Sequence, residues 1–511
     1  NYKAFGTSSI MFGDTTTGTI SGANYNTGID IDVFAALTTG DENIALGYSA
    51  LNDLTTGSSN TAMGSTAGGK ITTGGSNVAL GADSLKNTTT ASNNTAVGYA
   101  ALTANTTGAS NTAVGYNAGA AITTGGYNVA VGRQALMTTT TVNDNVAVGN
   151  NALRLNTTGA SNTAIGSSAL DANTTASNNT AVGKSALLAN TTGTGLVAVG
   201  TNALDANTTA NYNVAVGLGS LTTNTTGDNN VALGAYALSD NSTADNNTAV
   251  GHHALYLNTT GAENTAVGAN AGDAITTGAY NSAFGKDSLG ATTTADHNTA
   301  LGRIALALNT TGAENTAVGS RALYSNSTAD NNTAVGKDSL TANTTGHSNT
   351  AVGAGAGSSV TTGVGNTLIG KDAGLDLTTG GSNSFVGRLS GQNTTTGNSN
   401  TALGYTSMSL NTTGDFNTAV GREALQQNTT ASYNTAVGHQ ALEENTTGNQ
   451  QVAVGALALD ANTTGANNVA LGYGSLTANT TASNNVAIGR TAMEANTTGA
   501  GNVAIGKDAL I

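Results

Sequence analysis

A fixed period of 17 residues constrains this chain more than any other feature of its sequence. A glycine preceded by a small residue and an apolar one falls at Gly47 and then at every 17th residue to Gly506, which gives 28 copies without an insertion or deletion. A fixed short period is typical of repeat architectures, in which each copy packs against its neighbours. The constant phase indicates stacked coils, because a coil that gained a residue would lose its register.

The repeat is numbered here so that this glycine is position 5, and the set of residues at one position is called a column. Column 1 is Asn in 26 of 28 copies, column 3 is Ala in all but two, column 4 is always apolar, column 8 is Ala or Ser, and column 9 is Leu in 20 copies. Alternating side chains predict a strand at positions 2 to 4 and a second short strand at positions 7 to 9. The glycine would end the first strand at a corner that requires positive φ or a close backbone approach.

These features predict an all-β fold, a parallel β-solenoid or β-roll of about 28 coils with a 17-residue repeat. We expect positions 2, 4 and 9 inside the coil and position 3 outside. A near-invariant Ala on an outer face suggests close packing against another chain, so we expect a parallel homotrimer with column 3 toward its axis. Residues 43–511 would form the solenoid, continuing beyond 511, and the degenerate residues 1–42 an N-terminal cap or junction over the open sheet edge.

Columns 9 and 12 exchange large side chains. Column 9 is Gly in six copies, and in five of them column 12 changes from its usual Asn or Thr to an aliphatic residue: Ile71, Ile122, Ile275, Val360 and Leu377. One core space that either position can fill would explain this, because cores do not tolerate voids. Leu51 with Leu54, and Gly391 with Thr394, do not follow the rule, so it is a tendency. We also expect Asn at column 1 to hydrogen-bond amide to amide along the stack, and Thr at columns 13 and 14 to form two further ladders.

The phrases "NTAVG", "NVAVG" and "NVAIG" resemble the "SVAIG" signature of YadA-like heads of trimeric autotransporter adhesins, and with their "NTTG" turns they are similar to repeats of phage and prophage tail-fibre proteins. The resemblance covers residues 43–511. It implies a left-handed parallel β-roll, three chains around one axis, and a role in attachment. YadA-like coils are typically shorter than 17 residues, and we expect no anchor, stalk or membrane barrel within these 511 residues.

Composition excludes several classes of function. Cys, Pro and Trp are absent, charged residues make up 9% of the chain, and the net charge of −14 disfavours nucleic acid as a partner. No apolar stretch is long enough to insert into a membrane. Neither a calcium-binding motif nor a catalytic constellation stands out. We therefore expect no enzymatic activity, cofactor or metal site. The "NTT" and "NNT" triplets also fit the N-glycosylation sequon.

Two sets of residues are candidates for binding. Ten of the 15 Lys and Arg residues occupy column 6, which also holds Tyr48, Tyr99, Tyr116, Tyr405 and Tyr473. This column is either a stripe for anionic or other glycans or, more simply, a salt-bridged rim. The second is an irregular zone in which three successive coils lack Leu at position 9 and column 3 departs from Ala, so that either the coil is repacked locally or a partner binds: Gly357, Leu368, Gly374, Phe385 and Gly391.

The function expected from the sequence is that of an extracellular, cell-surface or virion fibre, a rigid shaft or head for attachment to a host or surface receptor. A phage tail fibre and a bacterial cell-surface adhesin are its two versions. A polymerising structural filament is an alternative. An ice-binding protein is another, because regular Thr columns can match a lattice, although the Thr pairs are adjacent in sequence whereas a flat face needs alternate ones.

Overall fold

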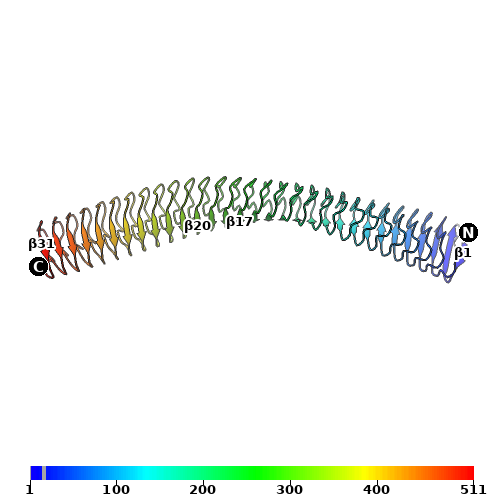
Figure 1. The fold of residues 1–511 in the computed structure, drawn as a ribbon, viewed down its shortest axis with the longest axis horizontal. Helices are drawn as coiled ribbons and strands as arrows, with labels where there is room; N and C mark the ends of the chain where they lie inside the picture. Colours follow the sequence, from blue (N-terminus) through cyan, green and yellow to red (C-terminus); the bar gives the residue numbers. More distant parts are fainter. Residues whose placement is uncertain (1, 14–18) are drawn as a thin grey trace. The chain divides into compact units, whose positions relative to one another are not determined.

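The computed structural model describes residues 2–13 and 19–511, which contain strands and turns and no helix. The chain divides into two compact units, Asn1–His253 and Ala254–Ile511. In each unit one 17-residue repeat makes one coil, and the coils stack so that their strands lie side by side (Figure 1). The parallel β-solenoid predicted from the period is confirmed.

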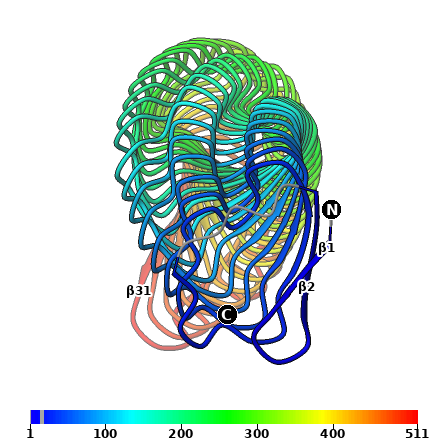
Figure 2. The ribbon, with the colours of Figure 1, turned by 90° about the vertical axis from the view of Figure 1, so that its right-hand side faces the viewer.

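The first unit begins with an antiparallel pair. Strand β1 (Tyr2–Phe5) pairs antiparallel with β2 (Ser9–Gly13), and β2 pairs parallel with β3 (Thr27–Asp30). Figure 2 shows β1 beside β2 at the N-terminal end of the stack. The outer edge of the parallel ladder is thus occupied by a strand of opposite direction, within the segment that the sequence predicts as a cap.

All later strands cover positions 2 to 4 of a coil, and within each unit each pairs in parallel with the same positions of the next coil, as Ala147 does with Ala164. The first unit continues with β4 (Ile44–Leu46), β5 (Thr61–Met63), β6 (Val78–Leu80), β7 (Thr95–Val97), β8 (Thr112–Val114), β9 (Val129–Val131), β10 (Val146–Val148), β11 (Thr163–Ile165), β12 (Thr180–Val182), β13 (Val197–Val199), β14 (Val214–Val216), β15 (Val231–Leu233) and β16 (Thr248–Val250). The second unit contains β17 (Thr265–Val267), β18 (Ser282–Phe284), β19 (Thr299–Leu301), β20 (Thr316–Val318), β21 (Thr333–Val335), β22 (Thr350–Val352), β23 (Thr367–Ile369), β24 (Ser384–Val386), β25 (Thr401–Leu403), β26 (Thr418–Val420), β27 (Thr435–Val437), β28 (Val452–Val454), β29 (Val469–Leu471), β30 (Val486–Ile488) and β31 (Val503–Ile505).

The segment at positions 7 to 9 is not a strand, so the second strand predicted from alternation is wrong. Positions 7 and 9 adopt left-handed backbone angles, for example φ 57° at Asn151 and 52° at Leu153. The N–H of Asn151 donates to Arg133 in the preceding coil, and that of Leu153 to Ala169 in the following coil. The N–H of Ala152 between them donates to Gly149 of the same coil, so alternate N–H groups bond to opposite neighbours and the segment links the coils without a pleated strand.

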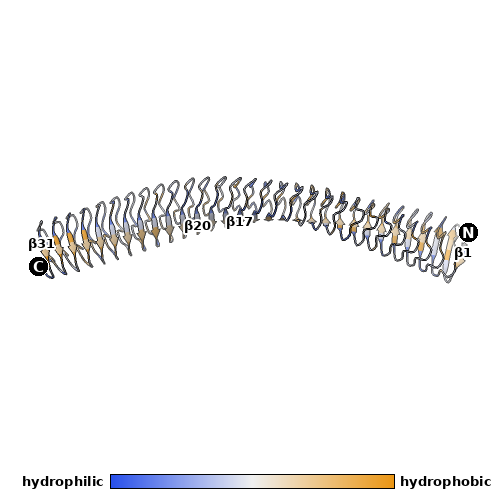
Figure 3. Cartoon of the chain, viewed as in Figure 1, coloured by the Kyte–Doolittle hydropathy of each residue, from blue (hydrophilic) through white to orange (hydrophobic). Residues whose placement is uncertain are grey.

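The inside and outside of the strand are also reversed relative to the expectation. Column 3 is buried in the coil, whereas the side chains of columns 2 and 4 face outward and are partly exposed. Figure 3 shows apolar colouring along the strands. Alternation grouped these positions correctly but did not determine which face lies inside. Leu at position 9 is fully buried as predicted in all coils but the last, where Leu510 is 63% exposed, and it leaves room for only a small side chain opposite it.

From position 9 to position 1 of the next repeat, burial follows a period of three. Positions 9, 12, 15 and 1 are buried, and positions 11, 14 and 17 point outward in most coils. The interior of a typical coil therefore holds one Leu, two Ala or Ser, and two Asn. Such a thin core requires polar ladders as well as apolar contacts to hold the coils together.

Two asparagine ladders satisfy these buried amides. At column 1, the backbone N–H and the Nδ2 of Asn315 both donate to Oδ1 of Asn298, at 3.1 and 3.2 Å. At column 12, Nδ2 of Asn343 donates to Oδ1 of Asn326 at 2.7 Å and to the carbonyl of Gly346 at 2.9 Å. The first ladder confirms the sequence prediction, and the second was not anticipated.

The fixed glycine has both properties that its invariance suggested. Gly353 has a φ of 140°, and a Cβ built on it would lie 2.6 Å from the carbonyl carbon of Gly370 in the next coil. Both the backbone angle and the spacing favour glycine, although Asp30 occupies the equivalent position of an N-terminal coil with a φ of 117°.

Candidate functional site

The irregular zone of the second unit is a rearrangement of the coil interior. Leu368 and Phe385, the two large residues of column 3, are fully buried. A Cβ on Gly357 would meet Leu368 at 2.5 Å, one on Gly374 would meet Leu368 at 2.9 Å, and one on Gly391 would meet the ring of Phe385 at 2.5 Å. The large side chains at position 3 thus occupy the space that Leu at position 9 vacates.

This arrangement explains the coil that broke the rule for columns 9 and 12. Gly391 has no aliphatic partner at position 12 because Phe385 already fills the space. The five candidate residues therefore lie together, but their side chains point into the coil. A partner of this zone would contact the outward residues of columns 2, 4 and 6, and its binding stays a prediction.

Column 6 is largely exposed, and five of its ten basic residues are paired with an acid of the same chain. Five of its basic side chains lie within 4 Å of the acidic residue that follows them: Lys286 with Asp287, Lys337 with Asp338, Lys371 with Asp372, Arg422 with Glu423, and Lys507 with Asp508, at 2.8 to 3.7 Å. These side chains form a salt-bridged rim, and each exposed pair contributes little to stability.

The tyrosines of this column stack on their neighbours along the coils. The guanidinium groups of Arg388 and Arg422 lie 5.8 and 5.9 Å from the ring centre of Tyr405. Tyr99 and Tyr116 stack on each other at 5.6 Å. Because ring faces engage adjacent coils, they offer less area for stacking on a sugar than the sequence suggested.

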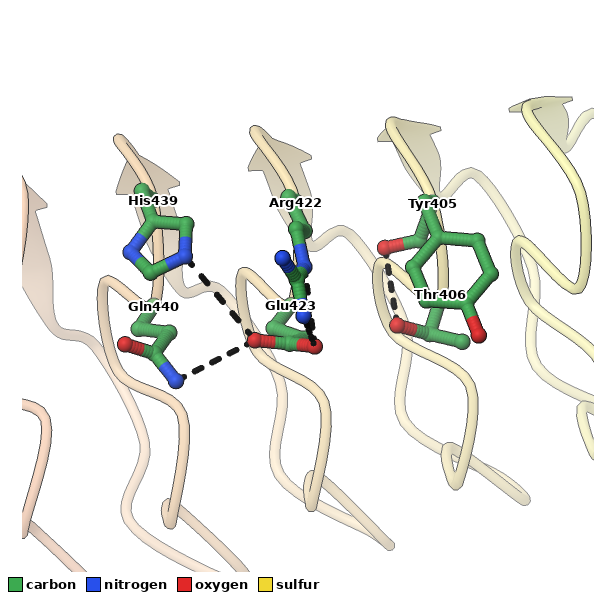
Figure 4. Close-up of polar contacts among 6 residues, drawn as sticks. All are labelled: Tyr405, Thr406, Arg422, Glu423, His439 and Gln440. Carbon is green, nitrogen blue, oxygen red and sulfur yellow. Dashed lines mark hydrogen bonds and ion pairs between the residues drawn. The ribbon is translucent and has the colours of Figure 1, made fainter.

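The best-connected polar cluster of this surface centres on Glu423 (Figure 4). Its carboxylate accepts hydrogen bonds from Arg422 at 2.8 Å and Gln440 at 3.1 Å, and His439 lies 4.0 Å away. The Glu423 side chain is only 13% exposed. Two successive coils therefore contribute to one network, and the carboxylate of Glu423 is bonded to residues of the chain itself.

Column 10 carries partly buried carboxylates. Burial raises the pKa of Asp205, Asp273 and Asp460, and it also raises that of Glu443, where the charges of Glu423 and Glu444 act in the same direction. These residues are spread over several coils. Among residues 2–13 and 19–511, no group of three or more His, Cys, Asp or Glu side chains is placed to hold a metal ion.

His252 and His253, at positions 6 and 7, stack with ring centres 3.8 Å apart. Adjacent residues of a strand would face opposite ways, but His253 has a left-handed backbone angle, φ 57°. The pKa of His253 is lowered by burial and by the charge of His252.

Comparison with known proteins provides no further constraint on the site. No protein-family model and no curated protein matches this sequence. Within the described ranges, no helix has the length and hydropathy needed to cross a bilayer.

Proposed function

We propose that this chain is a non-enzymatic, extracellular or virion fibre that acts as a shaft or head for attachment to a host or surface receptor. Its copies would associate with one another, as a homotrimer in the architecture that the YadA-like resemblance implies. The observation that supports the proposal most is the bonding between coils: backbone hydrogen bonds and two asparagine ladders join each typical coil to both neighbours. Such a stack keeps its length under load and presents the same surface many times.

The distribution of charged groups agrees with this role. Acidic and basic side chains of column 6 and 7 pair with each other, and the buried polar groups are chiefly amides committed to ladders. The structure therefore offers repeated outer columns for contact.

Attachment can be tested with beads that carry the purified chain. Retention of these beads, but not of uncoated beads, on bacterial cells, on animal epithelial cells or on polysaccharides isolated from either surface would support the proposal. Failure to bind any of them would contradict it. A bacterial adhesin and a phage fibre would then be distinguished by whether the chain is displayed on cells or on virions.

Ice binding is the second candidate, and column 14 favours it. Every coil from Thr39 to Thr498 has Thr at this position, and each of these side chains is exposed, whereas the neighbouring outward columns 11 and 17 vary widely. The hydroxyl of position 13 is used differently: Thr344 donates to the carbonyl of Thr361 in the next coil. Freezing-point hysteresis, lost when Thr311, Thr328 and Thr345 are changed to Lys, would support ice binding. Its absence in the unchanged chain would exclude it.

A further inference from the structure

A groove in the second unit lies between columns 14 and 16 of two successive coils. Its cavity volume is about 320 Å³. The lining comes from positions 14 to 17 of one coil and positions 14 and 16 of the next: Thr328, Ala329, Asp330, Asn331, Thr345 and His347. All of these except the alanine are exposed. The groove includes no residue of the salt-bridged rim or of the irregular zone, so it is a separate feature of the surface.

Column 16 usually bonds a backbone N–H group of the preceding coil. Where this position is Asp, Asn or Ser, its side-chain oxygen accepts the N–H of position 16 one coil earlier. Asp330 accepts from Ala313 at 2.7 Å, and Asn398 accepts from Gly381 at 2.9 Å. The N–H groups of this column therefore point along the stack, each toward position 16 of the next coil.

This bonding is interrupted at the groove. Position 16 is His347, Val364 and Gly381 in three successive coils. The N–H groups that face them belong to Asp330, His347 and Val364, and none donates to any of the described residues. The His347 ring is engaged within its own coil, with Nδ1 3.2 Å from Oγ of Ser348. Elsewhere in residues 2–13 and 19–511, no more than two successive coils lack this bond. The groove thus presents the longest row of unbonded N–H groups in this column.

The groove also contains unbonded oxygens. The hydroxyls of Thr328 and Thr345 form no hydrogen bond with the described part of the chain. Asp330 uses one carboxylate oxygen for Ala313, and its other oxygen has no partner among the described residues. Donors and acceptors therefore lie within one or two coils of each other. Hydroxyl groups suit such a mixture, because each can both donate and accept.

The spacing of the row fits a sugar ring. Successive N–H groups are about 4.8 Å apart, the distance between coils. Equatorial oxygens on alternate carbons of a pyranose ring are separated by nearly the same distance, so one ring can accept from two coils. Val364 is 38% exposed beside the row, and a Cβ on Gly365 would have no atom nearer than Ser382 at 4.0 Å. The valine methyl groups can contact the C–H face of a ring, and the glycine leaves room for it.

Charge narrows the class of ligand further. The lining contains the carboxylate of Asp330 and no Lys or Arg, and the chain has a net charge of −14, so an anionic ligand would be repelled. A cation would face a row of N–H donors in place of the several oxygens that it requires. A neutral ligand rich in hydroxyl groups satisfies both conditions.

From these observations we infer that the groove binds a neutral hexopyranose residue of a surface polysaccharide. The unbonded backbone N–H groups donate to sugar oxygens, and the carboxylate of Asp330 accepts from a sugar hydroxyl. Thr328 and Thr345 bond the ligand from the side of column 14. The inference rests on the attachment in the proposed function, and it names the ligand class and the coils that bind it.

Binding is tested on the full chain with four neutral tetrasaccharides: maltotetraose, cellotetraose, mannotetraose and galactotetraose. The acidic tetragalacturonate serves as the comparison ligand. We expect isothermal titration and saturation-transfer NMR to detect binding of at least one neutral tetrasaccharide and none of tetragalacturonate.

The row of N–H groups is tested by His347→Asp with Val364→Asn, which gives two of these coils the usual acceptor at position 16. The new carboxylate can accept from Asp330, as Asp245 does from Asp228 at 2.7 Å. We expect this variant to melt at or above the temperature of the unchanged chain, because two more N–H groups are bonded, and to lose tetrasaccharide binding. The matched control places the same residues in column 16 far from the groove, with Ala279→Asp and Ala466→Asn, and should bind like the unchanged chain.

The carboxylate is tested separately by Asp330→Asn. The amide oxygen can still accept from Ala313, as Asn398 does from Gly381, so the coil should keep its fold. We expect the affinity for the neutral tetrasaccharide to fall roughly tenfold, because a hydrogen bond to a charged group is replaced by a neutral one.

Three results would overturn the inference: no binding of any neutral tetrasaccharide, binding of tetragalacturonate in their place, or a variant with both acceptors that binds as tightly as its control. The attachment proposal fails separately. A chain that binds no tetrasaccharide while its beads still attach to cells would remove the groove alone. A chain that binds one while its beads attach to nothing would remove attachment alone.

Discussion

The ring of Phe385 occupies the space that a side chain on Gly391 would enter. Its Cε2 and Cγ atoms lie 2.5 and 2.6 Å from the position of a Cβ on that glycine. The same relationship holds at the other end of the chain, where a Cβ on Gly28 would lie 3.1 Å from the ring of Phe34. Position 3, 9 or 12 can therefore supply a large side chain to the interior of a coil, and three coils hold two of them: Phe34 with Leu37, Leu51 with Leu54, and Leu368 with Leu377.

Replacing Phe385 with Ala should therefore destabilise the second unit by about 3 to 5 kcal/mol, as for a buried aromatic residue removed from a core. Adding Gly391→Leu to the same chain should recover most of this loss. The φ of Gly391 is 59°, close to that of the Leu residues in this column, such as 51° at Leu323. Denaturant unfolding of the two variants provides the measurement. A double variant no more stable than Phe385→Ala would disprove the shared space.

The same exchange can be tested in the first unit with Ile122→Asn. A Cβ on Gly119 would lie 3.1 Å from Cδ1 of Ile122, so the change leaves a void beside Gly119. It also supplies an amide to Oδ1 of Asn105, which has no hydrogen-bond partner among the described residues. We expect the free energy of unfolding to fall by about 1 to 3 kcal/mol. This is less than the cost of the same void together with a buried polar group that has no hydrogen-bond partner.

Gly119→Leu in the Ile122→Asn chain recreates the common coil, with Leu at position 9 and Asn at position 12. Its denaturation midpoint should return close to that of the unchanged protein. Gly119→Leu alone serves as the control and should destabilise, because even a Cβ there would lie 3.0 Å from Cδ2 of Leu102 and 3.1 Å from Cδ1 of Ile122.

The sequence predicted the architecture because a 17-residue period and strand alternation are local properties of the chain. It did not predict which strand face is inside, since that depends on Leu153 or its equivalents crossing the coil to meet the strand. The left-handed backbone angles at positions 7 and 9 could not be predicted either. Glycine at a position suggests positive φ, whereas residues such as Asn151 and Leu153 do not by themselves indicate it. The zone around Leu368 and Phe385 was recognised as irregular, but its meaning required knowing that position 3 is interior.

The pH dependence of stability should reflect the carboxylates of column 10. Burial raises the pKa of Asp460 above its ordinary value of 3.8, so the folded state binds the proton more tightly than the unfolded state. The stability associated with this proton is fully present below the unfolded pKa and is lost as pH rises through the folded one. Asp460→Asn should therefore stabilise the chain at pH 7, by less than about 1 kcal/mol for this half-buried group, and have little effect at pH 3.

Denaturation midpoints at the two pH values check this expectation, with Asp376→Asn as an exposed control in the same unit. Equal effects of Asp460→Asn at both pH values would show that the carboxylate does not titrate differently in the folded chain.

The fixed glycine column should be the least tolerant position of the coil. In Gly353→Ala the new Cβ would lie 2.6 Å from the carbonyl carbon of Gly370 and 3.0 Å from the nitrogen of Lys371, both backbone atoms of the next coil. Its φ of 140° adds strain of about 1 to 3 kcal/mol. We expect Gly353→Ala to lower the free energy of unfolding by at least this amount. The backbone amides that join this coil to the next should also exchange their hydrogens faster.

Gly365→Ser is the matched control for Gly353→Ala, because it lies in the same coil at position 17 and also has positive φ, 66°. The nearest atoms to its added Cβ are 4.0 Å away, in Ser382, and other coils already have Ser there, such as Ser348 with a φ of 61°. The control should be nearly neutral. If both variants lost the same stability, positive φ alone would explain the glycine column, and the close approach of neighbouring coils would have no part in it.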